Sequence, residues 1–322
     1  MSLNLRKKGI VLGIVIFGLG VIYSLASFLV YDKLSRVEAG YGEASGNVPT
    51  AFSFKEGKWQ SFRTDPFQMR AYERVTFESR QKGIQLAGWF VPNKESHRVI
   101  IVVHGFNKSK ADTKILLAGG MLWRNGFNIL FVDLRDHGES DIEDGRTALG
   151  TAEYLDVLGA WDWLQSNRGF QPKKIGGFGG SLGAATVINA MGAEPEWVAS
   201  FVDSPFSNLK DIIRSELTTH HYPRILSTGG IWMAKLVSGD DLLGISPEAS
   251  VGKLGARRLY VVHAINDKTV DISHAKKLKS LTHGKGAEFW FVDEGNHVES
   301  ITLFPKEYEE RMAKFFAHHL SE

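Results

Sequence analysis

The stretch IGGFGGSLG, residues 175–183, joins a short apolar strand to a helix and contains the pattern G-x-S-x-G. Lys174 to Phe178 is expected to form the strand, and Leu182 to Met191 the helix. The glycines permit a turn so tight that its flanking positions must be nearly free of side chains. Such a turn lifts the hydroxyl of Ser181 out of the fold at a helix N-terminus. A serine held there can attack a carbonyl if a base and oxyanion donors converge on it.

A nucleophilic serine needs a histidine to take its proton and a carboxylate to hold that histidine in the correct tautomer. Downstream of the serine, Arg258 to Val262 and Glu288 to Val292 are each expected to form a strand. Asp267 follows the first of these strands and His297 follows the second. This is the chain order that a serine on a strand-to-helix turn requires of its partners. The sequence therefore predicts a catalytic triad of Ser181, Asp267 and His297.

Other titratable residues near these positions have structural interpretations. His263 ends a strand and is expected to be packed and hydrogen-bonded, whereas Asp271 is expected to cap a helix. Asp293 precedes a glycine turn. His104 lies upstream of the serine, so we expect it to organise its own loop through hydrogen bonds. Asp267 itself could be only a turn-forming residue, an alternative that its position in NDKTV, residues 266–270, makes less favourable.

An oxyanion hole is expected from two backbone N–H groups. The first belongs to Leu182, the residue after the serine, and is reinforced by the positive end of the helix dipole. The second belongs to the loop after the third strand, residues 98–103, which are RVIIVV. We assign this donor to Phe106, because Gly105 lets the chain approach the serine closely.

These motifs together resemble the α/β-hydrolase superfamily, in its serine-hydrolase branch of esterases, lipases and related acyl hydrolases. The resemblance covers about residues 70–320. It rests on HGF at 104–106, DLRDHGES at 133–140, the serine turn, DSP at 203–205, HAIND at 263–267 and GNH at 295–297. It implies that Arg135 and His137 brace neighbouring loops. Within the superfamily the sequence looks most similar to membrane-tethered bacterial hydrolases described as esterase-like or lysophospholipase-like. A serine nucleophile argues against the dehalogenase and epoxide-hydrolase branches, which use an aspartate.

The pattern of strands predicts an α/β fold. Strands are expected near 72–80, 85–91, 98–103, 127–133, 174–178, 197–203, 257–263 and 287–292, with helical stretches between them. This alternation indicates a mostly parallel eight-stranded sheet covered by helices on both faces, and its first two strands could be an antiparallel edge hairpin. The resemblance adds the α/β-hydrolase fold, with a small helical cap after the sixth strand, about residues 206–256. The cap is rich in apolar residues, which either pack on the body or in part line an acyl pocket.

The N-terminal segment predicts a membrane anchor. Gly9 to Tyr31 is a run of 23 residues without a charge, preceded by a basic cluster at 6–8. As a helix it would span about 34 Å, enough for a bilayer core of about 30 Å, and it is too long for a cleaved signal peptide. We expect a single-pass signal anchor with the N-terminus in the cytoplasm and the catalytic domain extracytoplasmic. Lys33 and Arg36 on the other flank weaken that charge asymmetry.

We therefore expect three parts: an anchor with its flanks over 1–36, a stalk or N-terminal extension over 37–71, and a catalytic domain over 72–322. The net charge of +2 and the lack of a basic stripe give no case for nucleic-acid binding. The absence of cysteine excludes disulfides, zinc thiolates and a thiol nucleophile. No His/Asp cluster has metal-ligand spacing, so no metal or other cofactor is expected.

The predicted function is that of a serine carboxylesterase or lipase-like hydrolase. It would cleave carboxylic esters of apolar or lipid-like acyl substrates through an acyl-serine intermediate, and a tethered enzyme with an apolar cap suits substrates that partition into membranes. A thioesterase or an amidase/peptidase with the same triad is an alternative. A prolyl-peptidase-like activity is less favoured because no propeller-sized domain precedes the core. A non-catalytic, membrane-displayed binding protein is a further alternative, although such proteins usually lose a triad residue. The sequence does not predict the oligomeric state.

Overall fold

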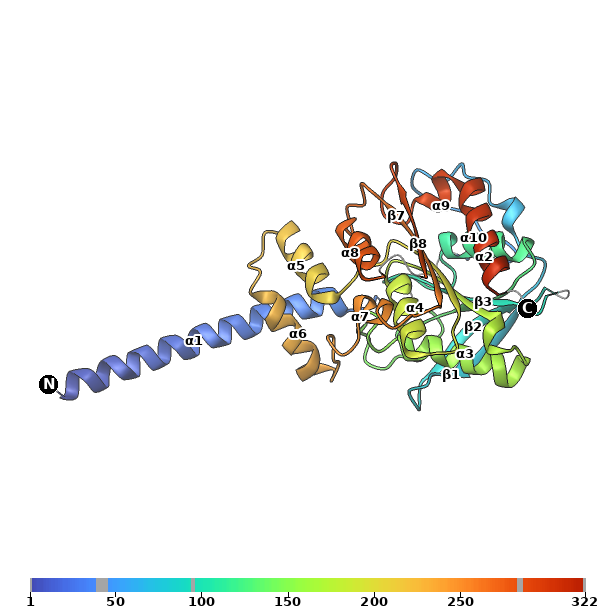
Figure 1. Cartoon of the computed structure of the whole chain (residues 1–322). Coiled ribbons are helices and arrows are strands. Elements are labelled where there is room, and N and C mark those ends of the chain that lie inside the picture. The colour runs from blue at the N-terminus through green and yellow to red at the C-terminus, as the bar shows by residue number, and fades with distance from the viewer. Residues whose placement is uncertain (1, 39–45, 94–95, 283–285, 321–322) are drawn as a thin grey trace.

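The computed structural model describes residues 2–38, 46–93, 96–282 and 286–320 (Figure 1). Its strands are β1 Glu73–Glu78, β2 Gln85–Val91, β3 Val99–Val103, β4 Asn128–Val132, β5 Ile175–Gly180, β6 Ala199–Asp203, β7 Arg258–Ala264 and β8 Ala287–Val292. Its α-helices are α1 Ser2–Ser35, α2 Thr113–Arg124, α3 Tyr154–Arg168, α4 Leu182–Ala193, α5 Leu209–Thr219, α6 Leu226–Val237, α7 Pro247–Val251, α8 Ser273–Leu281, α9 Ser300–Leu303 and α10 Pro305–His319. Two short 3₁₀ helices lie at Asp65–Phe67 and Pro172–Lys174.

Within these ranges the strands form one eight-stranded sheet in the order β1-β2-β4-β3-β5-β6-β7-β8. β1 and β2 form an antiparallel hairpin at one edge, and β2 also pairs antiparallel with β4. The remaining pairs are parallel. The mostly parallel sheet and the edge hairpin are as the sequence predicted, and the α/β-hydrolase fold is confirmed.

The strand order places the ends of β3 and β5 side by side. β3 lies between β4 and β5, so the chain leaves β3 toward one side of the sheet and later returns on the other. Crevices for ligands form at such a reversal, beyond the carboxyl ends of the strands. Every residue of β3 and β5 is buried, which explains the unbroken apolar run in β3.

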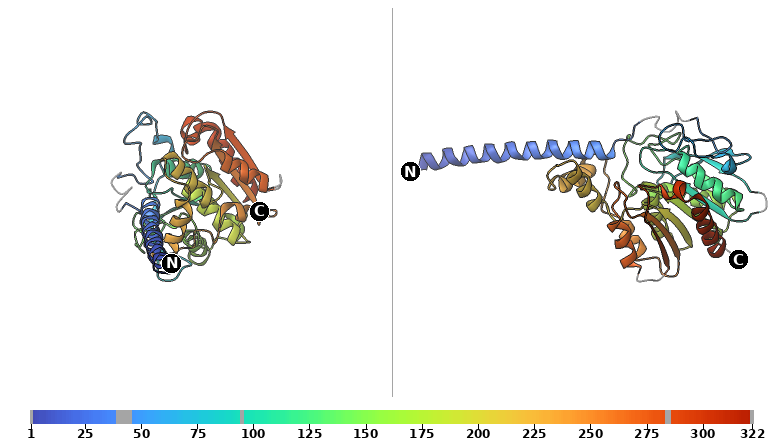
Figure 2. Two further views of the ribbon diagram at one scale, coloured as in Figure 1. Left: turned by 90° about the vertical axis from the view of Figure 1, so that its left-hand side faces the viewer. Right: turned by 90° about the horizontal axis from the view of Figure 1, so that it is seen from above.

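Helices cover both faces of the sheet (Figure 1, Figure 2). On one face α3, α4 and α8 pack through side chains such as Trp161, Val187 and Leu278. On the other face α2 and α10 contribute Leu116 and Phe316. The sheet is therefore held rigidly on both sides, and the loops at its carboxyl edge are the part free to carry a site.

The segment before β1 was expected to form a stalk or an N-terminal extension. Residues 39–45 of that stretch lie outside the described residues. Phe52, Phe67 and Met69 are buried in the same cluster as α2 and α10, and the side-chain amide of Asn47 donates to Thr113 Oγ1 at 3.0 Å. Residues 46–71 are thus packed on the body. Isolated apolar side chains of this irregular segment thus have a place in the core.

α1 projects from the body as a long helix (Figure 1, Figure 2). Among the described helices, its stretch Lys7–Ser35 alone is long and apolar enough to cross a membrane or to act as a signal anchor. The helix is exposed over most of its length, but Val30 and Tyr31 near its end are buried against the body.

The predicted cap after β6 is present as α5, α6 and α7, which lie between β6 and β7. Its buried residues Leu209, Ile213, Leu217 and Leu226 share one apolar cluster with the end of α1 and with Leu182 of α4. The cap and the last turns of α1 therefore form a single packed unit beside the helix that follows the serine.

Candidate active site

Ser181 stands on a sharp turn between β5 and α4. Its backbone has φ 57° and ψ −120°, a conformation that a residue with a side chain rarely adopts. Only glycine fits at two flanking positions: a Cβ on Gly179 would collide with the carbonyl of Gly183, and a Cβ on Gly183 with the carbonyl of Val103. The N–H of Ser181 donates to the carbonyl of Asp203 at 2.9 Å, which fixes the turn against β6.

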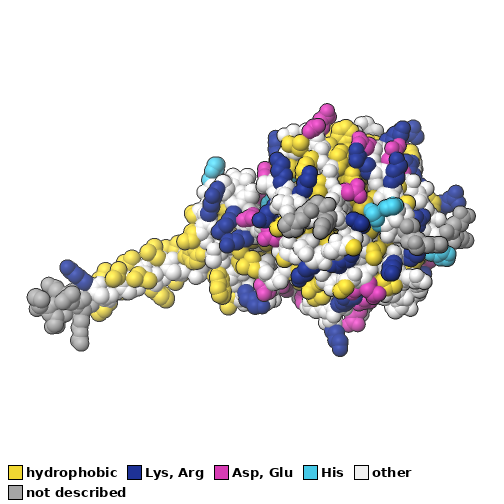
Figure 3. Space-filling model, in the orientation of Figure 1, with side chains coloured by type: hydrophobic (Ala, Val, Ile, Leu, Met, Phe, Trp, Pro, Cys, Tyr) yellow, Lys and Arg dark blue, Asp and Glu magenta, His cyan; other side chains and the backbone are white. Residues whose placement is uncertain are grey.

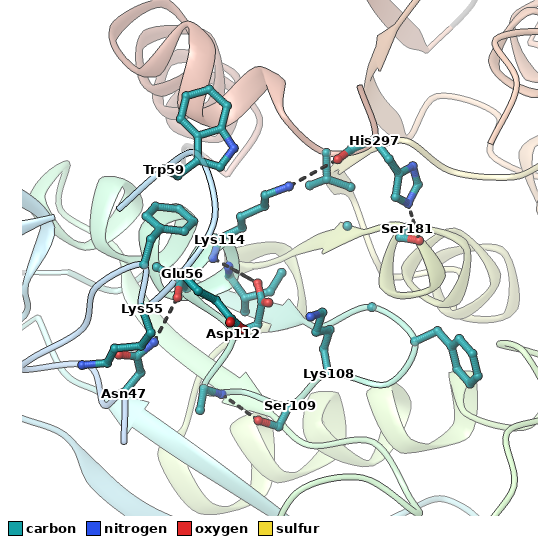
Figure 4. A pocket seen from close by; sticks show the side chains of 18 of the residues that line it. Asn47, Lys55, Glu56, Trp59, Lys108, Ser109, Asp112, Lys114, Ser181 and His297 are labelled. Atoms are coloured by element: carbon teal, nitrogen blue, oxygen red, sulfur yellow. Dashed lines mark hydrogen bonds between the residues drawn. The ribbon is translucent and has the colours of Figure 1, made fainter. Parts of the chain in front are cut away.

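The serine lies at one end of a chain of hydrogen bonds. His297 Nε2 is 2.7 Å from Ser181 Oγ, and His297 Nδ1 is 2.7 Å from Asp267 Oδ2. Figure 4 shows the imidazole of His297 directed at the hydroxyl of Ser181. The side chain of Asp267 is inaccessible to solvent and that of His297 is 19% exposed. The structure thus brings together the three residues that the sequence singled out.

Asp267 is held in its ionised form. Burial acts to raise the pKa of its carboxyl, but hydrogen bonds from His297 and from the N–H groups of Val270 and Thr269 outweigh burial and leave the pKa below its ordinary value. An ionised carboxylate can only accept a hydrogen bond, so it keeps a proton on His297 Nδ1. The other ring nitrogen is then free to accept the proton of Ser181.

His263 lies next to this series of hydrogen bonds but is not part of it. Its Nε2 donates to the carbonyl of Val270 at 2.7 Å and is 3.5 Å from Asp267 Oδ2. Burial lowers the pKa of His263, so the ring is neutral at neutral pH. It is a packed, hydrogen-bonded residue, as its position at the end of β7 suggested.

His104 organises the loop after β3. Its Nδ1 is 2.8 Å from the carbonyl of Gly105, and its Nε2 accepts the N–H of Leu134 at 3.1 Å. Complete burial, followed by the neighbouring His137, holds its pKa well below the ordinary value. The neutral ring therefore joins the loops after β3 and β4, and it makes no contact with the serine hydroxyl.

The two segments that were expected to carry the oxyanion donors both lie next to the serine. Leu182 begins α4 immediately after Ser181. A Cβ on Gly105 would lie 3.5 Å from the Cβ of Ser181, so the loop that carries Phe106 passes directly beside the serine.

The loop after β4 is held in place by buried ion pairs between side chains. The carboxylate of Asp133 accepts the backbone N–H of Lys110 and forms an ion pair with its ammonium group. Arg135 donates to the carboxylate of Asp156, with Nη2 to Oδ1 at 2.6 Å, and is almost completely buried. His137 Nδ1 is 2.8 Å from the carbonyl of Arg135. Arg135 and His137 thus hold loops in place, the role that the family resemblance implied.

Two further residues near the site were not singled out by the sequence. Asp203, at the end of β6, is fully buried and accepts from the hydroxyls of Tyr308 and Ser204; burial raises its pKa to about 6. Lys114 on α2 donates to the backbone carbonyl of His297 at 3.3 Å (Figure 4), and burial lowers its pKa. Asp203 had a signal, because it begins the DSP motif, whereas Lys114 belongs to no motif.

A cavity of about 980 Å³ adjoins Ser181 and His297. Its apolar lining includes Phe54, Trp59, Phe106, Ile115 and Val298, and its charged lining includes Lys55, Glu56, Lys108, Asp112 and Lys114 (Figure 4). The volume lies at the upper end of the usual range for small-molecule sites. None of its described lining residues comes from 206–256, so the described cap residues do not line this cavity. Among the described residues no group of three His, Asp or Glu side chains could hold a metal ion.

Comparisons with known proteins identify relatives of this arrangement. An uncharacterised protein of Mycobacterium tuberculosis is 28% identical over 148 residues, which are 44% of this chain and 47% of that protein. A thiohydrolase of Aspergillus aculeatus is 28% identical over 121 residues, 38% of this chain and 37% of that protein. The chain thus spans about half or less of the length of these curated relatives. An esterase of Pyrococcus furiosus has the same fold, with a TM-score of 0.66 at 22% identity, over 85% of this chain and 98% of that one.

The model of the prolyl oligopeptidase family matches residues 120–322, more than half of the 322 residues. The matched region contains the serine turn and both strand-end loops that carry Asp267 and His297. The chain therefore belongs to the prolyl oligopeptidase family, and its fold is that of the α/β-hydrolases.

Proposed function

We propose that the protein hydrolyses carboxylic esters with an apolar acyl chain through an acyl-serine intermediate. The observation that carries this proposal is the relay Asp267–His297–Ser181, with both hydrogen bonds at 2.7 Å, opening onto a cavity large enough for a small-molecule ester. Each member is positioned by a different strand end, which is the arrangement that generates a nucleophilic serine on demand.

In the first step His297 Nε2 takes the proton of Ser181 as the serine oxygen attacks the ester carbonyl. The negative charge that develops on the carbonyl oxygen is stabilised by the N–H groups of Leu182 and Phe106. Loss of one such donor typically costs about 3–4 kcal/mol in the transition state. His297 then gives its proton to the departing alcohol, and the acyl group remains on Ser181.

In the second step water replaces the alcohol. His297 removes a proton from the water as it attacks the acyl-serine, and the same donors stabilise the second tetrahedral intermediate. The serine oxygen leaves with the proton from His297, which releases the acid and restores the enzyme. Asp267 remains ionised throughout and stabilises the imidazolium form of His297 in both steps.

The cavity supports an amphiphilic ester as substrate. Aromatic and aliphatic side chains, among them Phe54, Trp59 and Ile115, can contact an acyl chain, whereas Lys55 and Lys114 offer charge to a polar head group. A monoacylglycerol or a lysophospholipid has this combination. The cap does not line this cavity. We therefore expect residues 54–59, rather than the cap, to contact the acyl chain.

A thioester is the second candidate substrate. The alignment with a thiohydrolase favours it, and the relay would attack a thioester carbonyl in the same two steps. The prolyl oligopeptidase family match supports an amide or peptide bond as a further member of the same series. All three bonds need the same oxyanion donors and differ in the leaving group that His297 must protonate.

The test is a panel of p-nitrophenyl esters of increasing acyl length, an acyl thioester and an acyl anilide, assayed with the full chain. We expect ester hydrolysis that rises with acyl length, and its loss in the Ser181→Ala variant. Ser280→Ala, which removes an exposed hydroxyl on α8, is the matched control and should retain full activity. Activity on acetate alone would refute the lipid-like substrate, and inertness toward every compound would favour a non-catalytic binding protein.

A further inference from the structure

The length of α1 fixes how deep a membrane would reach along it. A helix rises 1.5 Å per residue and a bilayer core is about 30 Å thick, so about 20 residues span the core. If the core begins at Gly9, directly after the exposed Lys7 and Lys8, it ends near Phe28. On this scale Tyr23 lies about 9 Å inside the far boundary of the core, and Ser27 about 3 Å inside it.

The cap helix α6 is packed against this same stretch of α1. The hydroxyl of Tyr23 donates to the carbonyl of Ile225 at 3.0 Å. Gly229 is in such close contact with Ser27 that any Cβ at this position would overlap the serine side chain, and a Cβ on Gly230 would lie 3.4 Å from Val30. The N-terminal half of α6 therefore lies at the depth of residues that a spanning α1 would place inside the bilayer.

An exposed apolar stripe beside this contact runs from the N-cap residue of α6 along the helix. Ile225, Trp232 and Leu236 are 66%, 70% and 77% exposed. Their spacing of seven and four residues places them on one helix face, next to Gly229, so the stripe continues the apolar surface of α1. Figure 3 shows apolar surface along α1 and on the cap beside it. We name Ile225, Trp232 and Leu236 the α6 stripe.

Ionic and backbone contacts hold α1 in this position relative to the body. Arg146 Nη2 is 2.6 Å from Asp32 Oδ1, and the N–H of Val37 donates to the carbonyl of Gly145 at 3.0 Å. The last turns of α1 are thus fixed to the loop after β4, and α6, which packs against α1, is held with them.

From these contacts we propose that α6 is a second membrane-binding element, whose stripe inserts into the leaflet on the catalytic side while α1 spans the bilayer. The partner that contacts the stripe is membrane lipid. This inference rests on the membrane placement of α1 and is independent of the bond that the enzyme cleaves. Exposed Arg224 and Lys235 next to the stripe supply the cationic flank that interfacial helices direct at lipid head groups. The catalytic domain is thereby held at a fixed distance from the bilayer.

The chain has no cysteine, so single cysteines can report membrane contact directly. The Leu236→Cys variant of the full chain is labelled with an environment-sensitive fluorophore and reconstituted in phosphatidylcholine nanodiscs, with or without lipid carrying a quencher on its acyl chain. Phe17→Cys, on the exposed middle of α1, is the positive control. Glu310→Cys, exposed on α10 away from α1, is the negative control (Figure 1).

We expect quenching at position 236 of at least half the extent found at position 17, and none at position 310. A label at 236 that stays in water while position 17 is quenched would overturn the inference. A label that is shielded from water but unquenched by lipid, with disulfide crosslinking of the unlabelled Leu236→Cys variant to a second chain, would also overturn it, in favour of an interface between copies. Lack of quenching at position 17 would remove the premise that α1 spans the membrane.

A second experiment separates this inference from the proposed function. In the double variant Trp232→Ser, Leu236→Ser we expect hydrolysis of an ester embedded in phosphatidylcholine vesicles to fall about tenfold, the scale of losing two inserted side chains. Hydrolysis of a water-soluble ester should be unchanged, because neither residue lines the cavity. A double variant that is as active as the wild-type chain on both substrates would contradict a role of the stripe. If the wild-type chain cleaves neither ester, the proposed function fails, and the labelling experiment still decides the position of α6.

Discussion

Replacement of Asp267 by Asn changes one atom of the relay and tests which ring nitrogen of His297 carries the proton. Asp267 Oδ1 accepts the N–H groups of Thr269 and Val270 at 2.8 and 2.9 Å, and an amide oxygen can keep both bonds. The amide nitrogen then takes the place of Oδ2, 2.7 Å from His297 Nδ1. Because an amide nitrogen only donates, it forces the imidazole proton onto Nε2. His297 would then donate to Ser181 and could not take its proton.

The expected loss follows from this change of tautomer. The geometry is retained, but the base is absent, and kcat should fall on the order of 10⁴-fold, or about 5.5 kcal/mol in the transition state. The oxyanion donors are untouched, so a residual rate above that of water should remain.

The assay is steady-state hydrolysis of a soluble p-nitrophenyl ester, with thermal unfolding followed in parallel to show that the variant is folded. Asp271→Asn is the matched control: its exposed carboxylate accepts the N–H of Ser273 at the start of α8, and kcat should change less than about twofold. A folded Asp267→Asn variant that keeps more than about a tenth of the wild-type kcat would refute the assigned relay.

Three further predictions follow from other contacts. Gly183→Ala would force a Cβ into the carbonyl of Val103, and thermal unfolding should show a loss of about 3 kcal/mol or more; an unchanged Tm would contradict the close approach. Lys114→Met removes the donor to the carbonyl of His297 and should lower kcat/KM about tenfold while shifting its pH profile; an unchanged profile would contradict a positioning role. Burial, together with neighbouring carboxylates, raises the pKa of Asp240 from 3.8 to about 7, so the native state holds a proton that the unfolded chain has lost and stability declines as pH rises through this window. Asp240→Asn should therefore stabilise the protein by about 1–2 kcal/mol near pH 8, after allowance for solvent screening, and far less near pH 4; an equal Tm change at both pH values would refute this.

The positions of Ser181, Asp267 and His297 could be inferred from the sequence because parallel strands bring their carboxyl ends to one edge. Each residue follows an apolar strand whose bounds are clear from its composition, and the glycines at 179 and 183 indicate the tight turn. The bracing function of His104 followed from the same logic, since it lies upstream of the serine.

The environment of the cap could not be inferred in this way. The contact between Tyr23 and Ile225 joins residues 202 positions apart, and no local pattern encodes it. Glycine is unfavourable in a helix, and only the close contact with Ser27, which leaves no room for a Cβ, explains Gly229. The burial of Phe52 and Met69 could not be inferred, because isolated apolar residues in an irregular segment have no periodicity to indicate a buried face.

The most direct measurement of the central claim is the site of covalent modification by a fluorophosphonate probe, mapped by mass spectrometry of proteolytic peptides. The account predicts one adduct per chain, on the hydroxyl of Ser181, and no labelling of the Ser181→Ala variant. An adduct on another residue, or undiminished labelling of that variant, would contradict it.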